Sequence, residues 1–301
     1  MPELPDVTVY VERLAARCVG QTLERIRVAG PSLLRSVDPP LSTAEGKRVL
    51  GVRRLGKRIV FELEAELFLV FHLMIAGRFR WRERGARASG KTGLASLDFA
   101  TGTLILTEAS TQKRATLYLV RGAAALAEHD PGGLEVLDAT FDEFRARLLS
   151  ENRTLKRALT DPHIFSGIGN AYSDEILHRA RLSPVTLTRR LSDEQCHQLY
   201  EATRETLALW TARLREQVGE GFPEKVTAFR PEMAVHGRYR QPCPACGAPV
   251  QRIVYAANET NYCARCQTSG KLLADRALSQ LLKKDWPKSL EELEALRRTH
   301  R

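Results

Sequence analysis

Residues 243–266 read CPACGAPVQRIVYAANETNYCARC, with two C-x2-C pairs separated by sixteen residues. A tight turn lets each pair present two sulfur atoms to one metal ion, and a hairpin between them returns the second pair to the first. The alternative is two disulfides in a secreted domain, but we expect no signal peptide, and Cys18 and Cys196 have no partner spacing. The pattern therefore favours one structural Zn2+ ion, held as thiolates by Cys243, Cys246, Cys263 and Cys266.

The charge of the chain is unevenly distributed. Its 301 residues carry a formal net charge of +10. Residues 47–58 contain six basic residues and no acidic one, and five arginines follow between residues 78 and 87. A single basic stretch is usually a solvated surface, but two of them beside a zinc hairpin favour phosphate binding. No apolar run approaches the roughly 20 residues of a membrane span, so we expect no membrane partner.

The first 120 residues have the pattern of a β-sandwich or barrel. A helix is expected over residues 6–18, with Val7, Tyr10 and Leu14 on one face. We predict an N-terminal β-sandwich domain with flanking helices over residues 1–128. Its expected strands are short apolar or alternating segments at residues 49–52, 59–63, 67–73, 94–99, 103–107 and 115–120.

The pattern becomes helical after a linker at residues 129–139. Thr140, followed three residues later by Glu143, has the spacing of a capping box at a helix start. We expect a helical domain over residues 140–234, the zinc finger over residues 235–270 and a C-terminal helical extension over residues 271–301. The predicted fold class is therefore α+β with several domains.

The start of the chain, Met1-Pro2-Glu3, carries a possible nucleophile. Removal of Met1 would leave the Pro2 nitrogen as a free secondary amine, which can attack a sugar carbon and form a Schiff base. Glu3 is placed to move protons at the same centre. The alternative is an ordinary terminus without chemistry.

A glycine-rich turn at residues 166–169 precedes Asn170 and a helical segment. Free backbone N–H groups at a helix start suit a DNA phosphate, and the Asn170 amide adds a donor. A tight turn between two helices would have the same sequence.

Taken together, these motifs resemble the formamidopyrimidine-DNA glycosylase / endonuclease VIII family. The Met-Pro-Glu-Leu-Pro start, Lys57, His72-Leu73, the turn before Asn170 and the four-cysteine finger occur in the family's order over residues 1–267. The resemblance implies a catalytic β-sandwich, followed by a helix–two-turn–helix domain with a β-hairpin zinc finger. It also implies damaged double-stranded DNA as the partner, lying across the cleft between the domains.

The resemblance further implies a bifunctional DNA glycosylase/AP lyase with Pro2, Glu3 and Lys57 as catalytic residues. Pro2 would attack C1′ of a flipped-out nucleotide while the base departs, Glu3 would protonate the sugar oxygen, and β,δ-elimination would follow. Lys57, His72, Asn170 and Lys156 would hold phosphates. From the residues alone, Lys57 could also belong to a solvated basic run, and His72 could be a core histidine.

The expected substrates are oxidised purines such as 8-oxoguanine and formamidopyrimidines. The alternatives are oxidised pyrimidines or another lesion, or a damage-binding protein of this fold without catalysis. We also expect a monomer in the cytoplasm, associated with the nucleoid.

Three features depart from the family's pattern. Asn258 stands where enzymes acting on 8-oxoguanine usually carry a phosphate-binding arginine, so the finger binds DNA more weakly or Arg252 or Arg265 compensates. Met74 or Ile75 would fill the gap left by the flipped nucleotide, and Arg114, without the family's aromatic neighbour, would reach the opposite base. The C-terminal extension would pack on the body or bind a partner.

Overall fold

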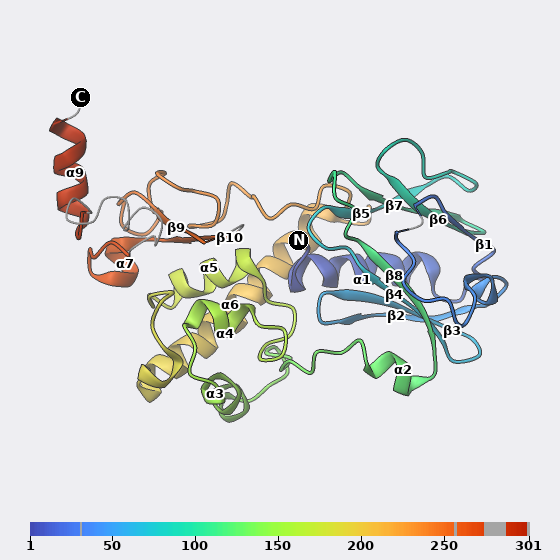
Figure 1. Ribbon diagram of the computed structural model, residues 1–301, viewed down its shortest axis with the longest axis horizontal. Coiled ribbons are helices and arrows are strands. Elements are labelled where there is room, and N and C mark those ends of the chain that lie inside the picture. The colour runs from blue at the N-terminus through green and yellow to red at the C-terminus, as the bar shows by residue number, and fades with distance from the viewer. Residues whose placement is uncertain (31, 256–257, 274–286, 300–301) are drawn as a thin grey trace. The chain divides into compact units, whose positions relative to one another are not determined.

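The computed structural model describes residues 1–301 except 31, 256–257, 274–286 and 300–301. The chain forms two compact units (Figure 1). The first unit comprises Met1–Gly133 and Ala208–Ala228, and the second comprises Leu134–Leu207 and Phe229–Arg301. The observed fold class is the predicted one: antiparallel sheets at the N-terminus, followed by a helical region and a hairpin finger.

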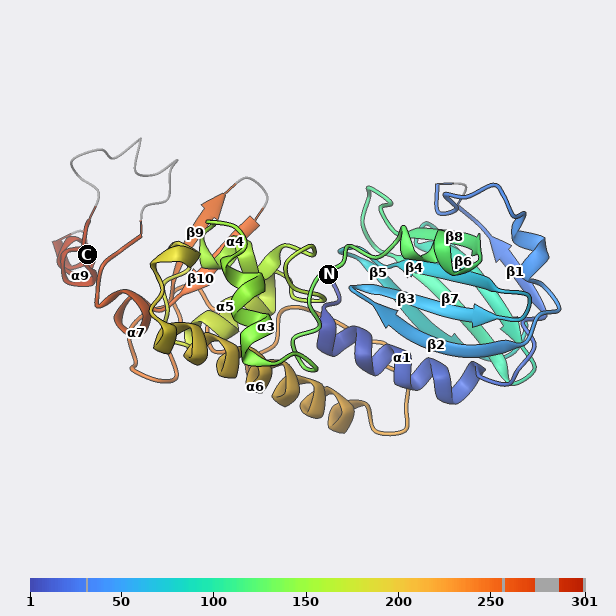
Figure 2. The ribbon, with the colours of Figure 1, turned by 90° about the horizontal axis from the view of Figure 1, so that it is seen from below.

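Two four-stranded antiparallel sheets form the first unit, in the orders β1-β6-β7-β5 and β2-β3-β4-β8. Their apolar faces share one core, in which Phe71 of β4 and Phe79 of β5 meet with ring centroids 5.2 Å apart. This confirms the predicted sandwich (Figure 2). The strands are β1 Arg25–Val28, β2 Val49–Leu55, β3 Arg58–Leu63, β4 Leu67–His72, β5 Gly77–Arg82, β6 Gly93–Phe99, β7 Gly102–Glu108 and β8 Thr116–Arg121.

The helices of the first unit cover this sandwich. Helix α1, Leu4–Cys18, buries Val7, Tyr10 and Leu14 in the core, as its helical spacing predicts, and lies beside β2 (Figure 2). The short helix α2, Ala123–Ala127, places Leu126 against β3 and β4 on the other face of their sheet. A 3-10 turn, η1, spans Leu41–Ala44.

The sequence did not predict β1 or β5. Strand β5 contains arginines at alternate positions, and its sequence indicates only a basic stretch. In the structure Phe79 is buried in the core, whereas Arg80 on the other face of the strand is exposed. Side chains on a strand alternate between its two faces, so a strand can belong to the core and to a basic surface at once.

The second unit is helical up to its finger. Thr140 caps α3 as predicted, since its side chain accepts from the Glu143 N–H and its own N–H donates to the Glu143 carboxylate at 2.8 Å. The remaining elements are α3 Phe141–Leu149, α4 Leu155–Thr160, α5 Asn170–Arg179, η2 Thr188–Arg190 and α6 Asp193–Val218. The last turns of α6, beyond residue 207, belong to the first unit.

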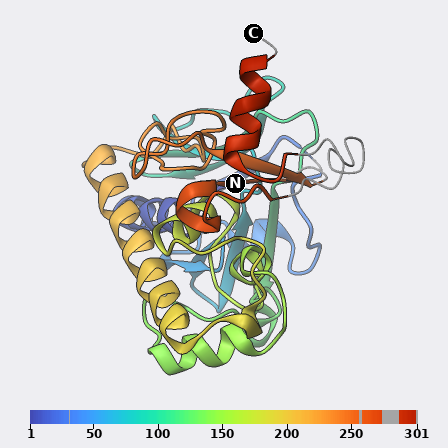
Figure 3. The same cartoon turned by 90° about the vertical axis from the view of Figure 1, so that its left-hand side faces the viewer.

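The finger contains the antiparallel hairpin of β9, Gln251–Tyr255, and β10, Asn258–Tyr262, followed by α7, Ala264–Thr268. Residues 274–286 of the predicted C-terminal helical extension lie outside the described residues. Its later part contains α9, Leu290–Thr299, and Leu290 packs in the core of the finger (Figure 3). Across the described ranges, none of the helices combines the length and the apolar character needed to span a bilayer.

Candidate active site and metal centre

The N-terminus is held firmly at the start of α1. Pro2 and Glu3 are buried, and Glu3 is only 3% exposed. The backbone N–H of Glu3 donates to Asp6 Oδ2 at 3.1 Å, one arm of a capping box. The pKa of the amine at Met1 is lowered, chiefly by burial; Glu3 and Asp6 oppose this shift, whereas the charges of Arg78 and Lys57 reinforce it. The surroundings of the chain start therefore favour a neutral amine.

Lys57 reaches this region from the turn between β2 and β3. Leu55 pairs with Arg58, so the two-residue turn consists of Gly56 and Lys57, and Gly56 has a φ of +60°. Glycine suits this first position of a tight hairpin turn. The charge of Lys57 lowers the pKa of both the N-terminal amine and His72. Glu3 and Lys57 thus both act on the amine at Met1, next to Pro2, and their catalytic roles stay predictions.

His72 ends β4, where it pairs with Arg58 on one side and Thr116 on the other. Burial, together with the charges of Arg58 and Lys57, lowers its pKa to about 4. The ring is therefore neutral at physiological pH, and a neutral imidazole offers a single N–H donor. A phosphate contact by His72 would be an uncharged hydrogen bond.

This shift predicts a pH dependence of stability. The unfolded chain binds a proton at a pKa near 6.5 and the folded chain near 4, so the free energy of unfolding falls as the pH drops between these values. The loss is on the order of 1–3 kcal/mol for this half-buried group. Urea unfolding at pH 7, 5.5 and 4.5 should show a shallower decline for His72→Gln than for the wild type. Equal declines in the two proteins would contradict the shift.

The turn after β4 presents an exposed apolar side chain. Ile75 is 60% exposed, whereas Met74 is half-buried with a φ of +52°. The Gly77 N–H donates to the Leu73 carbonyl at 2.8 Å and closes the turn. Of the two residues predicted to fill the gap left by the flipped nucleotide, Ile75 is therefore the one whose side chain is exposed on the turn.

Gly77 is required at this turn because a Cβ there would lie 2.2 Å from the Leu73 oxygen. Gly77→Ala is expected to lower the free energy of unfolding by about 2 kcal/mol or more, because the backbone at Leu73 would have to move to make room for the new Cβ. The matched control is Gly30→Ala, whose Cβ would meet only the Leu94 side chain at 3.3 Å. Its expected cost is below about 1 kcal/mol. Equal losses by chemical denaturation would contradict this view of the turn.

The loop at residues 109–115 is fixed by Glu108, which the sequence did not single out. Glu108 is 1% exposed, and its carboxylate accepts from the backbone N–H groups of Arg114, at 3.0 and 3.1 Å, and Ala115, at 3.2 Å. The Arg114 Nη2 donates to Gln112 Oε1 at 2.6 Å. The predicted DNA contact Arg114 is thus part of a loop anchored by a buried carboxylate.

In the second unit, the glycine-rich turn leads into α5 as predicted. Gly167 has a φ of +78°, and Asn170 is the first residue of the helix. The Asn170 Nδ2 donates to the Glu259 carbonyl on β10 at 2.8 Å. The amide predicted to bind phosphate therefore also ties the helix start to the finger hairpin.

Lys156, a predicted phosphate contact, is bound to acceptors within the second unit. Its Nζ donates to Asp174 Oδ1 at 2.5 Å, the Asn170 carbonyl at 2.7 Å and Ser173 Oγ at 2.8 Å. An ammonium group has three N–H donors, and these acceptors match all three. Only 13% of the side chain is exposed. Lys156 joins α4 to α5, and a phosphate could bind only by displacing one of these acceptors.

Asp174 is the centre of this network and was not predicted. It is fully buried, and its Oδ2 accepts from the Asn261 N–H at 3.1 Å and lies 2.8 Å from His236 Nδ1. The adjacent Glu175 carboxylate accepts from the backbone N–H groups of residues 234–236 at 2.7–3.0 Å. Helix α5 and the finger are therefore joined within the second unit by buried, hydrogen-bonded carboxylates.

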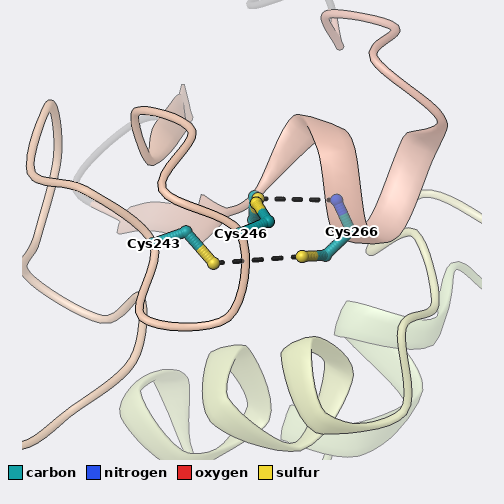
Figure 4. A group of neighbouring side chains, drawn as sticks. Cys243, Cys246 and Cys266 are labelled. Atoms are coloured by element: carbon teal, nitrogen blue, oxygen red, sulfur yellow. Dashed lines mark hydrogen bonds between the residues drawn. The ribbon is translucent and has the colours of Figure 1, made fainter.

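The four predicted zinc ligands converge. Their sulfur atoms lie within 4.8 Å of one another, with Cys243 and Cys266 at 3.9 Å and Cys246 and Cys263 at 3.4 Å. A tetrahedral site with Zn–S bonds of about 2.3 Å needs sulfur atoms about 3.8 Å apart. Figure 4 shows the sulfur of Cys243 facing that of Cys266 on α7. The four cysteines form the site of one structural zinc ion, and His178 Nε2 of α5 lies 3.2 Å from Cys243 Sγ.

The basic side chains of the finger are engaged in local contacts. Arg252 Nη1 donates to Glu259 Oε2 at 3.0 Å, and its guanidinium lies 4.3 Å from the centre of the Tyr239 ring. Arg265 Nη1 donates to the Cys246 carbonyl at 3.3 Å. Asn258 begins β10, paired with Tyr255. Of the two candidates to replace the missing finger arginine, only Arg252 lies on the hairpin.

The sandwich with Pro2 and Glu3 buried at its chain start, the glycine turn that opens α5 and the four-cysteine finger are the parts expected of a DNA glycosylase of base excision repair, and the relatives of the chain show this class. Three family profiles match in the same order: the formamidopyrimidine-DNA glycosylase N-terminal domain over residues 1–116, its H2TH domain over residues 133–214, and the zinc finger found in FPG and IleRS over residues 240–268. The chain belongs to the formamidopyrimidine-DNA glycosylase family.

Individual relatives cover most of the chain. It is 36% identical to the formamidopyrimidine-DNA glycosylase of Thermus thermophilus over 282 residues, 90% of this chain and all of the relative. The crystal structure of the MutM (Fpg) protein from Thermus thermophilus matches with a TM-score of 0.73 at 34% identity, covering 88% of this chain and 98% of that one. The Lactococcus lactis Fpg bound to DNA with an abasic site matches with a TM-score of 0.76 at 27% identity, covering 88% and 99%. Further structures of the Lactococcus protein hold Fapy-dG or oxidised-pyrimidine DNA.

Proposed function

We propose that this glycosylase is bifunctional and that its Pro2 amine, freed by removal of Met1, is the nucleophile. The buried chain start carries this proposal: Pro2 and Glu3 are buried, and for the amine of Met1, one residue earlier, burial and the charges of Arg78 and Lys57 lower the pKa and favour the neutral form, in which an amine can attack carbon. Glu3 is the carboxyl group nearest in sequence and is 3% exposed. Burial of this kind suits a group that exchanges protons with a substrate.

The Pro2 nitrogen bonds to C1′ of the damaged nucleotide and gives up its proton, and the base leaves with the electrons of the glycosidic bond and takes up a proton. A proton from Glu3 to the ring oxygen O4′ opens the sugar and gives an iminium ion. Loss of a proton from C2′ expels the 3′ phosphate, a second elimination expels the 5′ phosphate, and water releases the sugar remnant from Pro2.

The proposed substrates are damaged double-stranded DNAs with oxidised purines. The Lactococcus relative has been crystallised with Fapy-dG and with oxidised-pyrimidine DNA, which supports both lesion classes as candidates. A specific observation keeps oxidised pyrimidines as the second candidate: Asn258 replaces the finger arginine, and Arg252 is paired with Glu259. We also propose that the enzyme acts as a monomer.

A panel of single-lesion duplexes tests the proposal. Each duplex carries 8-oxoguanine, a formamidopyrimidine, an oxidised pyrimidine or an abasic site, and base release is scored separately from strand scission. Oxidised-purine release that is followed by scission is expected. Base release without scission would contradict the lyase activity, and tight binding without either product would identify a damage-binding protein.

A further inference from the structure

Arg78 combines an unusual set of contacts on the outer face of β5. Its Nε donates to the Val226 carbonyl at 2.6 Å, and its Nη1 donates to the carbonyls of Gly77 at 2.6 Å and Ile75 at 3.1 Å. All three acceptors are backbone oxygens. Within the described part of the chain, the guanidinium forms no ion pair with a carboxylate. Arg78 is thus fixed in position by backbone oxygens.

These contacts connect two segments that are far apart in sequence. Ile75 and Gly77 belong to the turn that exposes the Ile75 side chain, and Val226 belongs to the segment after α6. Both lie in the first unit. Among the described residues, Arg78 alone joins this turn to Val226 by hydrogen bonds.

Other residues hold the rest of the segment after α6. Arg82 Nη2 donates to Glu224 Oε2 at 3.0 Å, and Arg17 Nη2 donates to the Glu220 carbonyl at 3.0 Å. The Phe222 ring lies 5.9 Å from that of Tyr10 in the core. Arg78 is therefore one of several anchors for the segment, so its replacement should shift Val226 without releasing the segment as a whole.

The charge of Arg78 acts on the N-terminal amine. The charged groups that act on the amine at Met1 are Glu3, which caps α1, Asp6 of α1, Lys57 from the turn before β3, and Arg78 from β5. The two carboxylates favour the protonated amine and the two cations oppose it.

We propose that Arg78 is a positioning residue of the active site, which joins the exposed Ile75 turn to Val226 by hydrogen bonds and whose positive charge acts on the chain start. This inference rests on the proposed role of the Pro2 amine. It separates into a hydrogen-bonding effect on the turn and an electrostatic effect on the amine, and two substitutions distinguish them.

Arg78→Met removes both effects, whereas Arg78→Lys keeps the charge but cannot reproduce the planar fork of donors. The assay uses full-length protein with a verified Pro2 terminus and measures borohydride trapping on abasic-site DNA between pH 5 and 9. For Arg78→Met, the acidic limb of the rate profile should move to higher pH by on the order of half a unit. For Arg78→Lys, the limb should stay in place. Both variants should bind a lesion duplex about tenfold more weakly.

Arg145→Met is the matched control, because Arg145 is a partly exposed arginine paired with Asp193 in the second unit. It removes the same charge and should leave the acidic limb unmoved. The inference would be overturned if Arg78→Met showed the acidic limb and the DNA affinity of the wild type. If Arg78→Met does not fold, wild-type DNA affinity in Arg78→Lys would overturn it. A wild-type protein that traps no DNA would instead refute the proposed function, so the two failures are distinguishable.

Discussion

Protein that keeps one residue before Pro2 is expected to lose strand scission by at least about 10³-fold, the scale on which nucleophile removal acts in other enzymes. The added residue converts the Pro2 nitrogen into an amide, whose lone pair is delocalised and cannot attack carbon. Pro2 and Glu3 are buried at the start of α1, and the free amine of the added residue would lie one residue earlier, so we expect it not to replace the Pro2 nitrogen.

The comparison uses a cleavable N-terminal tag. Cleavage that leaves Pro2 first should restore scission, and cleavage that leaves one extra residue should not, with intact mass confirming each terminus. Both forms should bind lesion DNA, because the finger and α5 are unchanged. Equal scission by the two forms would show that another group is the nucleophile.

Removal of zinc is expected to have the second largest effect. The finger core is small, built around Val235, Val250, Tyr262 and the cysteines, and a core of this size depends on its metal. Loss of the metal would also free the Glu259 carbonyl from Asn170 and the Asn261 N–H from Asp174. If the finger and the start of α5 together lose two hydrogen bonds to DNA, at about 1.5 kcal/mol each, DNA binding should weaken by about 100-fold.

Cys263→Ser tests this expectation, with DNA affinity and zinc content measured together. Cys196→Ser is the matched control, since Cys196 is equally buried in the second unit but lies outside the metal cluster. The control should keep its zinc and its affinity. Wild-type affinity in zinc-free Cys263→Ser would contradict a role for the finger in binding.

Much of the fold could be predicted because local patterns determine it. The apolar segments of the sandwich, the capping box at Thr140 and the spacing of the four cysteines each have a local physical cause. Strand β5 was missed because arginines occupy every second position, alternating with Phe79 and Trp81, so the segment resembles a basic stretch and not an apolar strand. Strand β1 has only four residues, three of them half-buried, which is too little for a pattern.

The candidate site could be predicted only in part. Motif residues such as Pro2, Glu3 and the cysteines are recognisable in the sequence. Glu108, Asp174 and Arg78 were missed because their partners are backbone groups or residues distant in sequence. The sequence does contain a weak signal for Asp174. Asp174 and the adjacent Glu175 lie in the helix that begins at Asn170, and two acidic residues are unusual on a surface that binds phosphate, which suggests that they are buried. Lys156 is basic and near the turn, but only the fold shows that Asp174 binds it.

The most direct test of the account is to locate the covalent bond. Protein with a verified Pro2 terminus is mixed with a duplex containing a single 8-oxoguanine, reduced with borohydride, digested and examined by mass spectrometry. The account predicts one DNA adduct, on the peptide that begins with Pro2 and on its nitrogen. An adduct on a lysine such as Lys57, or no adduct while the base is still released, would contradict it.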